Sequence, residues 1–301
     1  MTLLGPLLFF LALLAVVAAW LAGPAVLAAV RRARVRRQPF PRAWREILRR
    51  RMPAFARLPA DLQLQVKKHV QVLLAEKPFI GCAGLVVTDE MRVLIAAQAA
   101  LLLLNRDADY FGNLRQVLVY PGAFVVEREL ADGSGLTHAT RRALAGESWQ
   151  QGQLLLSWDD VLAGAADPDD GHNVVIHEFA HQLDQERGRA NGAPWLGRRE
   201  AEPPPRRRGA APSRPGRGAG HEPGGPYPRW ARVLGAEFEQ LRQRLARGET
   251  GVIAAYAATD PAEFFAVVSE HFFEQPAALA AAHPALYAEF ARLYRCDPLA
   301  W

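Results

Sequence analysis

The stretch His172–Asp184, with the sequence HNVVIHEFAHQLD, contains the motif from which the rest of the chain can be interpreted. It holds H-E-x-x-H as His177, Glu178 and His181. An α-helix brings residues four apart onto one face, so the two imidazoles can bind one Zn²⁺ while Glu178 lies beside a metal-activated water. The apolar residues around the motif predict a buried helix, and buried imidazoles and carboxylates need partners. The stretch therefore predicts a zinc site rather than an amphipathic helix that carries two histidines by chance.

Positive charge is concentrated in two short segments. The chain has 301 residues, half of them hydrophobic, which is enough for one large domain or two small ones. Its net charge is +5, but residues 31–51 carry +9 and residues 199–229 carry +4, which leaves −8 on the rest. An acidic body does not favour nucleic acid, so we predict no direct nucleic-acid contact. The cysteines, Cys82 and Cys296, lie far apart and are predicted to be free thiols.

The N-terminus is strongly apolar. Residues 3–30 contain no charged side chain, and the first 20 of them, before Gly23, have the length of a helix that crosses a bilayer. A secretory signal peptide would have its positive charge before the apolar run, whereas here the arginines follow it. The pattern predicts a transmembrane anchor at residues 1–30 and a basic juxtamembrane segment at 31–52. The N-terminus would lie outside a bacterial-type inner membrane and the catalytic domain in the cytoplasm, with a location in the cytosol as the alternative.

The remaining sequence, residues 53–301, has the pattern of an α+β domain with a small sheet and a helical active-site half. Residues 199–229, rich in Pro, Arg and Gly, have almost no large apolar side chains and predict a disordered insertion. Hydrophobic periodicity predicts the following elements. The strands are Leu85–Thr88, Gln116–Tyr120, Phe124–Arg128 and Leu154–Ser157, and the helices outside the motif are Pro53–Leu74, Arg92–Leu104, Trp230–Arg247 and Pro284–Trp301.

A catalytic zinc takes three protein ligands and keeps one open position, so a third ligand must be found. The zincin class that continues as H-x-x-G-x-x-H is excluded, because Asp184 and Arg187 stand at the Gly and His positions. The other class takes a glutamate from a later helix. Thr259–Pro261 predicts the start of such a helix, and Glu263 and Glu270 share one of its faces. The residues alone favour Glu263 over Glu270 without excluding either, and Glu263 could instead complete a capping box.

Two motifs together, HNVVIHEFAHQLD and AYAATDPAEFFAVVSEHFF, resemble the Mlc titration factor A family of zinc peptidases, which are glucose-regulated metallopeptidases. The resemblance extends from about Pro53 to the C-terminus, apart from the insertion. It implies that Glu263, in the D-P-A-E run, is the third ligand. The family site is similar to that of the anthrax lethal factor protease domain, which has a tyrosine before the third ligand, and Tyr256 occupies that place here. The insertion and the N-terminal span depart from the family pattern.

The resemblance implies a zincin-like fold of the gluzincin type with one Zn²⁺ per chain. In this arrangement Glu178 would take a proton from the attacking water and pass it to the leaving amine. Tyr256 would donate a hydrogen bond to the developing oxyanion. Asp184 and Glu270 are predicted to support the ligand histidines, with a solvated helix-end acid as the alternative for Asp184. The predicted metal ligands are His177, His181 and Glu263.

These features predict a zinc peptidase whose substrate is a peptide or protein. The resemblance implies aminopeptidase-type trimming, although the same chemistry suits cleavage within a chain. A different class of function is a regulatory interaction protein, because the family is named for binding a transcriptional repressor. In that case the protein would sequester the repressor, and the zinc would be structural.

Overall fold

The computed structural model describes residues 4–106, 109–131, 137–144, 146–149, 152–186, 188–196 and 226–301. Most of the predicted insertion, residues 199–225, lies outside these ranges, so its disorder stays a prediction.

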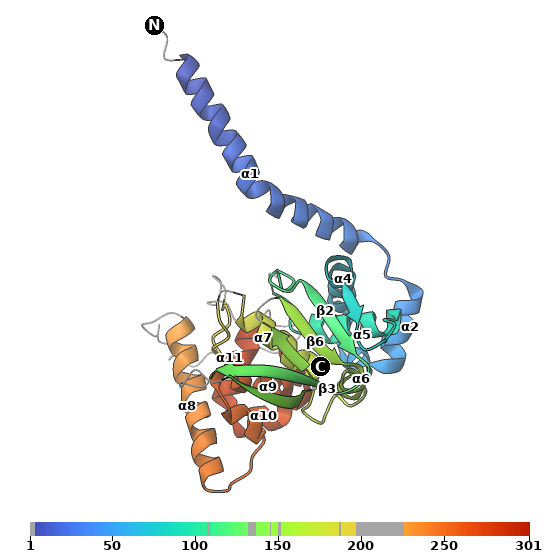
Figure 1. Cartoon of the computed structure of the whole chain (residues 1–301), viewed down its shortest axis with the longest axis vertical. Helices are drawn as coiled ribbons and strands as arrows, with labels where there is room; N and C mark the ends of the chain where they lie inside the picture. Colours follow the sequence, from blue (N-terminus) through green and yellow to red (C-terminus); the bar gives the residue numbers. More distant parts are fainter. Residues whose placement is uncertain are drawn as a thin grey trace, which may run out of the picture.

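The described chain is a mixed α and β structure in which most helices follow the strands (Figure 1). The helices before the first long strand are α1 (Leu4–Arg37), α2 (Arg42–Arg51), α3 (Pro53–Arg57), α4 (Ala60–Glu76) and α5 (Asp89–Leu101). The strands are β1 (Phe79–Gly81), β2 (Gln116–Tyr120), β3 (Phe124–Ala131), β4 (Thr137–Leu144), β5 (Gly146–Trp149) and β6 (Gln153–Ser157). The later helices are α6 (Trp158–Ala166), α7 (Val174–Asp184), α8 (Pro226–Ala246), α9 (Pro261–Glu274), α10 (Pro276–Ala282) and α11 (Pro284–Tyr294), with 3₁₀ turns η1 (Ala255–Ala258) and η2 (Pro298–Ala300).

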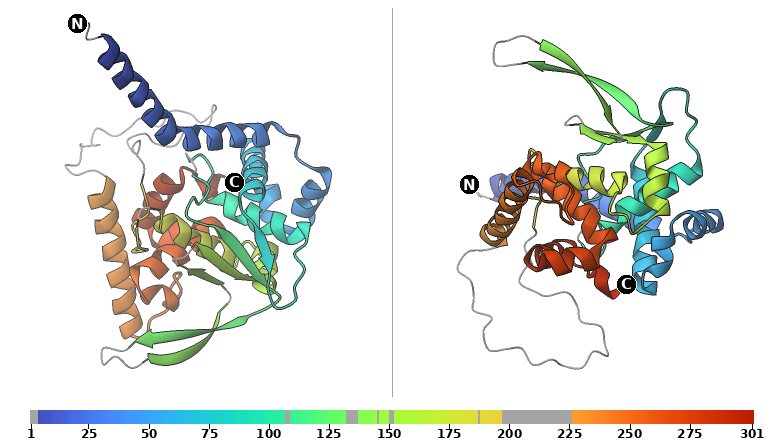
Figure 2. Two further views of the ribbon diagram at one scale, coloured as in Figure 1. Left: turned by 45° about the horizontal axis from the view of Figure 1, so that its top comes forward. Right: turned by 90° about the horizontal axis from the view of Figure 1, so that it is seen from below.

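The main sheet has the strand order β1-β2-β6-β5. Its first three strands are parallel, and β5 pairs with β6 in the antiparallel direction. Val117 of β2 lies opposite Leu154 of β6, and Val119 lies opposite Leu156; all four side chains are buried. The strands β3 and β4 form a separate hairpin that extends from the body (Figure 2). The sheet and its covering helices thus support α7 from one side.

The C-terminal helices build an aromatic core on the other side of α7. Trp230 of α8 stacks on Phe290 of α11, with ring centroids 5.4 Å apart, and Phe265 of α9 lies 5.6 Å from Phe290. All three side chains are buried. This packing fixes α9, which runs beside α7.

The sequence predicts some strands better than others. The strand predicted at Gln116–Tyr120 is confirmed without a shift, and the one at Leu154–Ser157 begins one residue earlier. The strand predicted at Leu85–Thr88 is wrong, because this segment is irregular and the strand lies before it at Phe79–Gly81. Positive φ angles at Ala83 and Gly84, of 51° and 81°, turn the chain between the two segments.

The N-terminal apolar segment forms α1, but this helix contains Pro24 and continues without a break into the arginines. Its C-terminal part rests on α4, where Arg32 donates two hydrogen bonds to Glu76 at 2.8 and 3.0 Å. Among the described residues, no helix combines the length and the apolarity needed to cross a membrane. The predicted anchor and the predicted single-pass inner-membrane location are therefore wrong. The predicted limits of the peptidase domain, residues 53–301, stay a prediction.

Candidate metal centre

The H-E-x-x-H motif lies on α7, and the residue that starts this helix is Asn173. Its side-chain Oδ1 accepts a hydrogen bond from the backbone N–H of Ile176 at 3.0 Å, which is the usual N-cap contact. His177 and His181 are four residues apart on this helix, so they point to the same side, and their ring centroids are 4.9 Å apart.

The third predicted ligand comes from the first turn of α9, which packs beside α7 (Figure 1). Asp260 caps α9 by accepting a hydrogen bond from the backbone N–H of Glu263 at 3.0 Å. The carboxylate of Glu263 does not complete a capping box but reaches α7. Its Oε2 lies 3.0 Å from Nε2 of His177 and 3.5 Å from Nε2 of His181.

These three side chains have the geometry of a metal site. The two Nε2 atoms of His177 and His181 are 3.2 Å apart, and one ligand atom from each of the three residues lies within 4.8 Å of the others. Zinc–nitrogen bonds of about 2.0–2.1 Å in a tetrahedron would place neighbouring ligand atoms about 3.3–3.4 Å apart. Two imidazole nitrogens and one carboxylate oxygen are also ligands that zinc prefers. The residues therefore fit a zinc ion with an open fourth position.

The charges at this site favour an ionised carboxylate. Burial opposes ionisation of Glu263, but its hydrogen bonds with the two histidines outweigh burial and hold the pKa of Glu263 well below its usual range. Burial lowers the pKa of His177, but its hydrogen bonds with Glu263 and Glu270 outweigh burial and raise that pKa well above its ordinary value. A metal ligand must be deprotonated; Glu263 is held in that form, whereas His177 would have to lose a proton to bind a metal.

Glu270, the other acid on this face of α9, contacts the opposite side of the same imidazole. Its Oε1 lies 2.8 Å from Nδ1 of His177, and its Oε2 accepts a hydrogen bond from the backbone N–H of Asn173 at 2.6 Å. A carboxylate on Nδ1 fixes the ring so that Nε2 faces the metal position. Glu263 therefore lies on the Nε2 side of the His177 ring and Glu270 on its Nδ1 side.

Asn173 and Glu274 were not predicted from the sequence to belong to this region. The side-chain Nδ2 of Asn173 donates to Oε1 of Glu274 at 2.9 Å, so Asn173 joins the start of α7 to two acids of α9. An asparagine directly before an apolar helical run is a recognisable N-cap signal and could have identified Asn173. Glu274 gives no such signal, because its partner is distant in the sequence.

Glu178 follows His177 on α7 and is almost completely buried. Its Oε2 has no hydrogen-bond partner among the described residues. Burial raises the pKa of Glu178 against the opposing effect of the two histidines. A buried carboxylate oxygen without a protein partner is costly to keep, and a catalytic base that acts on a bound water has this environment.

The two other predicted residues lie at opposite ends of the site. Tyr256, on η1, is 42% exposed, and its ring centroid is 6.2 Å from that of His177. Asp184 lies at the end of α7, where its Oδ2 accepts hydrogen bonds from the backbone N–H groups of Asn191 and Gly192, each at 2.7 Å. The structure joins Asp184 to this loop rather than to a ligand histidine, because the chain turns back over the end of α7 and brings both N–H groups to its carboxylate.

The same loop contacts the first turn of α9. Gly192 has a φ of +75°, and a Cβ built at this position would lie 2.4 Å from the backbone oxygen of Pro261. The carbonyl of Gly192 accepts a hydrogen bond from the indole of Trp230 at 2.8 Å. The loop thus holds the end of α7 against α9, two residues before Glu263. The dipeptide Asn-Gly at 191–192 predicts a turn, but nothing in it predicts contact with a ligand helix.

The chain is similar to known proteins over both the H-E-x-x-H stretch and the stretch that contains Glu263. A family model described as glucose-regulated metallo-peptidase M90 matches residues 27–205 and 217–295. An uncharacterised protein of Synechocystis sp. is 37% identical over 263 residues, which cover 87% of this chain and 86% of that protein. A protein named Mlc titration factor A from Serratia proteamaculans is 38% identical over 233 residues, 76% of this chain and 78% of its own. Another of that name from Yersinia pestis is 32% identical over 262 residues, 85% of each chain.

Proposed function

The chain belongs to the family of glucose-regulated metallopeptidases, and on this premise we propose that it is a zinc-dependent peptidase whose residues 53–301 form a zincin-like domain of the gluzincin type. The observation that carries the proposal is the convergence of His177, His181 and Glu263 beside the buried Glu178. Two imidazoles, one ionised carboxylate and a neighbouring base are the parts that metal-assisted hydrolysis of an amide requires.

The proposed mechanism gives each residue a role at a stated atom. When bound, Zn²⁺ supplies a Lewis acid that polarises the scissile carbonyl and lets water attack near neutral pH. Glu178 accepts a proton from this water at its carboxylate and then donates it to the leaving amine. The hydroxyl of Tyr256 donates a hydrogen bond to the oxygen of the polarised carbonyl. Glu270 holds the His177 ring with Nε2 towards Glu263.

We extend the proposal to aminopeptidase-type trimming of peptides. Its support is the family resemblance of the two motif stretches. The measurement is hydrolysis of matched peptides with a free or an acetylated N-terminus. An aminopeptidase cleaves the peptide with a free N-terminus and leaves the acetylated peptide intact. Equal cleavage of both peptides would contradict aminopeptidase activity and would indicate an endopeptidase instead.

The catalytic proposal is tested by Glu178→Gln in the zinc-loaded protein. We expect kcat/KM for a peptide-anilide substrate to fall about 10²- to 10⁴-fold, because the water loses its proton acceptor. Zinc content, measured by atomic absorption, should stay at one ion per chain, since the ligands are unchanged. A matched control is Glu239→Gln, the same change at an exposed glutamate of α8. Hydrolysis that survives in Glu178→Gln with zinc still bound would show that the catalytic assignment is wrong.

A second candidate function is regulation through a repressor, and the observation that favours it is the name of the relatives, Mlc titration factor A. In this proposal the chain binds and sequesters a transcriptional repressor, and the zinc is mainly structural. Calorimetric titration with purified Mlc separates the possibilities. Binding that persists in Glu178→Gln while hydrolysis is lost would show that both functions coexist, and the absence of binding in both forms would exclude this function for Mlc.

A further inference from the structure

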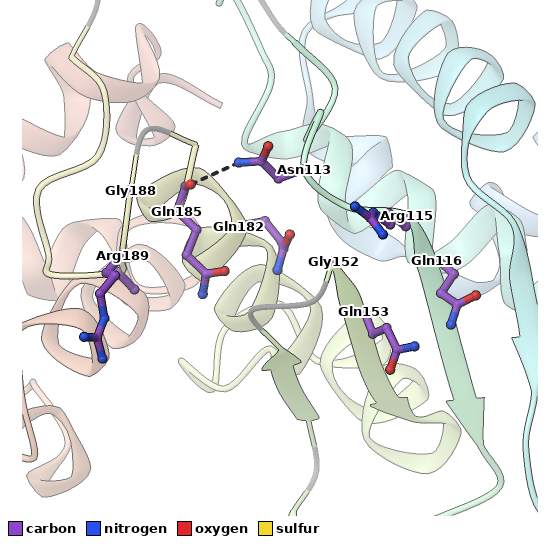
Figure 3. A pocket seen from close by; sticks show the side chains of 10 residues that line it. Asn113, Arg115, Gln116, Gly152, Gln153, Gln182, Gln185, Gly188 and Arg189 are labelled. Atoms are coloured by element: carbon purple, nitrogen blue, oxygen red, sulfur yellow. Dashed lines mark hydrogen bonds between the residues drawn. The ribbon is translucent and has the colours of Figure 1, made fainter.

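A polar cavity of about 940 Å³ lies between the C-terminal part of α7 and the starting ends of β2 and β6 (Figure 3). Gln182 comes from α7 and Gln185 directly follows its end, while Gln116 and Gln153 come from the two strands and face the same space. We call this cavity the amide pocket. Primary amides can donate and accept hydrogen bonds, so four of them suit the N–H and C=O groups of an extended peptide.

The amide pocket has a positive charge. Arg115 and Arg189 are part of its lining, and the described residues that line it include no Asp or Glu. Both arginines are exposed, and within the described ranges neither forms an ion pair. Guanidinium groups without an acidic neighbour attract anions, and carboxylates most directly, because the planar fork of Arg matches their two oxygens.

The amide pocket lies on the same face of α7 as the proposed catalytic base. Gln182 and Gln185 are four and seven residues after Glu178, and these spacings return to one side of a helix. With a rise of about 1.5 Å per residue, they lie roughly 6 and 10 Å beyond Glu178 along the helix axis. An extended peptide advances about 3.3 Å per residue, so this distance corresponds to about two or three substrate residues.

We propose that the amide pocket binds a carboxylate of the substrate two or three residues from the scissile bond. Arg115 and Arg189 would pair with this carboxylate, and the glutamine amides would hold the adjoining peptide backbone. The preferred substrates are then peptides with an acidic side chain, or a free C-terminal carboxylate, at that position. This inference rests on the proposed peptidase function and deepens it by naming the substrate class.

The test compares quenched fluorescent peptides that differ only by Glu or Gln at one position, scanned through three positions on each side of the scissile bond. We expect kcat/KM to be about tenfold higher for Glu than for Gln at one position two or three residues from the bond. In Arg115→Gln/Arg189→Gln this preference should fall to about onefold, while the control Arg37→Gln, at an exposed arginine of α1, keeps it. Because each variant is compared with itself on two peptides, a general loss of stability does not affect the ratio.

Two outcomes of this comparison contradict the proposal, and two further arms complete the test. No preference at any position, or a preference that the double variant retains, would overturn the proposal. Amidation of the peptide C-terminus separates the two sources of the carboxylate, because it removes a preference for a free C-terminus and leaves one for a side chain. If the wild type hydrolyses none of the peptides, the peptidase proposal fails. The pocket is then judged by fluorescence anisotropy with zinc-loaded Glu178→Gln, where tighter binding of the Glu peptide must depend on the two arginines.

Discussion

The two ends of α9 contact the same imidazole from opposite sides. In the first turn, Glu263 faces Nε2 of His177, and its side chain is 20% exposed. Two turns later, Glu270 faces Nδ1 of the same ring, and its side chain is 8% exposed. The first end is also held by the loop that contains Gly192, and the second by Asn173 at the start of α7.

This comparison shows that the role of an acid here follows from the nitrogen that it meets. Glu263 and Glu270 have the same chemistry, share one helix face and both contact His177. The one on the Nε2 side also reaches His181 and is the proposed third ligand, whereas the other is proposed to align the ring. Metal affinity should therefore fall steeply when Glu263 is replaced and less when Glu270 is replaced.

The largest effect is expected for Glu263→Ala. It removes one of the three proposed ligands, so zinc affinity should fall by roughly a thousandfold or more, and peptidase activity should disappear with the metal. Competition with a chromogenic chelator measures the affinity. If Glu263→Ala keeps its zinc and Glu270→Ala loses it, the assignment of the two ends is reversed and Glu270 is the ligand.

A smaller effect is expected for Glu270→Ala, because the ligands remain and only the orientation of His177 is released. Loss of such a supporting carboxylate typically costs about 10- to 100-fold in metal affinity. Glu270→Gln, which keeps an acceptor for Nδ1–H, should recover part of this loss, whereas a role limited to packing would give both variants the same affinity. Equal loss in Glu263→Ala and Glu270→Ala would remove the distinction between the two ends.

Sequence reasoning reached the parts of this site that are fixed by spacing along one helix. His177, Glu178 and His181 follow from the period of α7, and Glu263 and Glu270 follow from the period of α9. Which acid meets which nitrogen depends on the register between two helices that are far apart in the sequence, so the residues alone left both open. The family resemblance selected Glu263, and the structure places its carboxylate beside both histidines.

The fold shows the same limit. Local apolar patterns predicted the strand at Gln116–Tyr120, but the parallel pairing of β1 with β2 depends on contacts between distant segments. The error at Leu85–Thr88 has this origin, because an apolar run of that length is equally compatible with an irregular segment; Val86 within it is 80% exposed. The amide pocket was not predicted for the same reason, since its lining comes from three separate segments.

The substitution Gly192→Ala tests whether the loop that contains Gly192 positions the first turn of α9. In Gly192→Ala the new Cβ would meet the backbone oxygen of Pro261, and the φ of +75° is unfavourable for alanine. We expect zinc affinity to fall about fivefold and stability by about 1–3 kcal/mol, because α9 must shift near Glu263. The matched control is Gly248→Ala, with a φ of +74° but no atom within 4 Å of its Cβ. If both variants lose the same stability and neither loses zinc affinity, the loop does not position the ligand.

The smallest effect on metal binding is expected at the far end of α9, where Glu274→Gln should change stability in a pH-dependent way. Burial, together with the charges of Asp170 and Glu270, raises the pKa of Glu274 to about 8 despite its hydrogen bond from Asn173. The folded chain then keeps a proton that the unfolded chain releases above about pH 4.3, so this group makes stability fall as the pH rises from there to about 8.

Glutamine at position 274 keeps the hydrogen bond from Asn173 and cannot ionise. The free energy of unfolding in urea should therefore favour the variant over the wild type by about 4 kcal/mol more at pH 8.5 than at pH 5, with zinc affinity unchanged. A stability difference that does not vary with pH would show that Glu274 is already ionised in the folded protein.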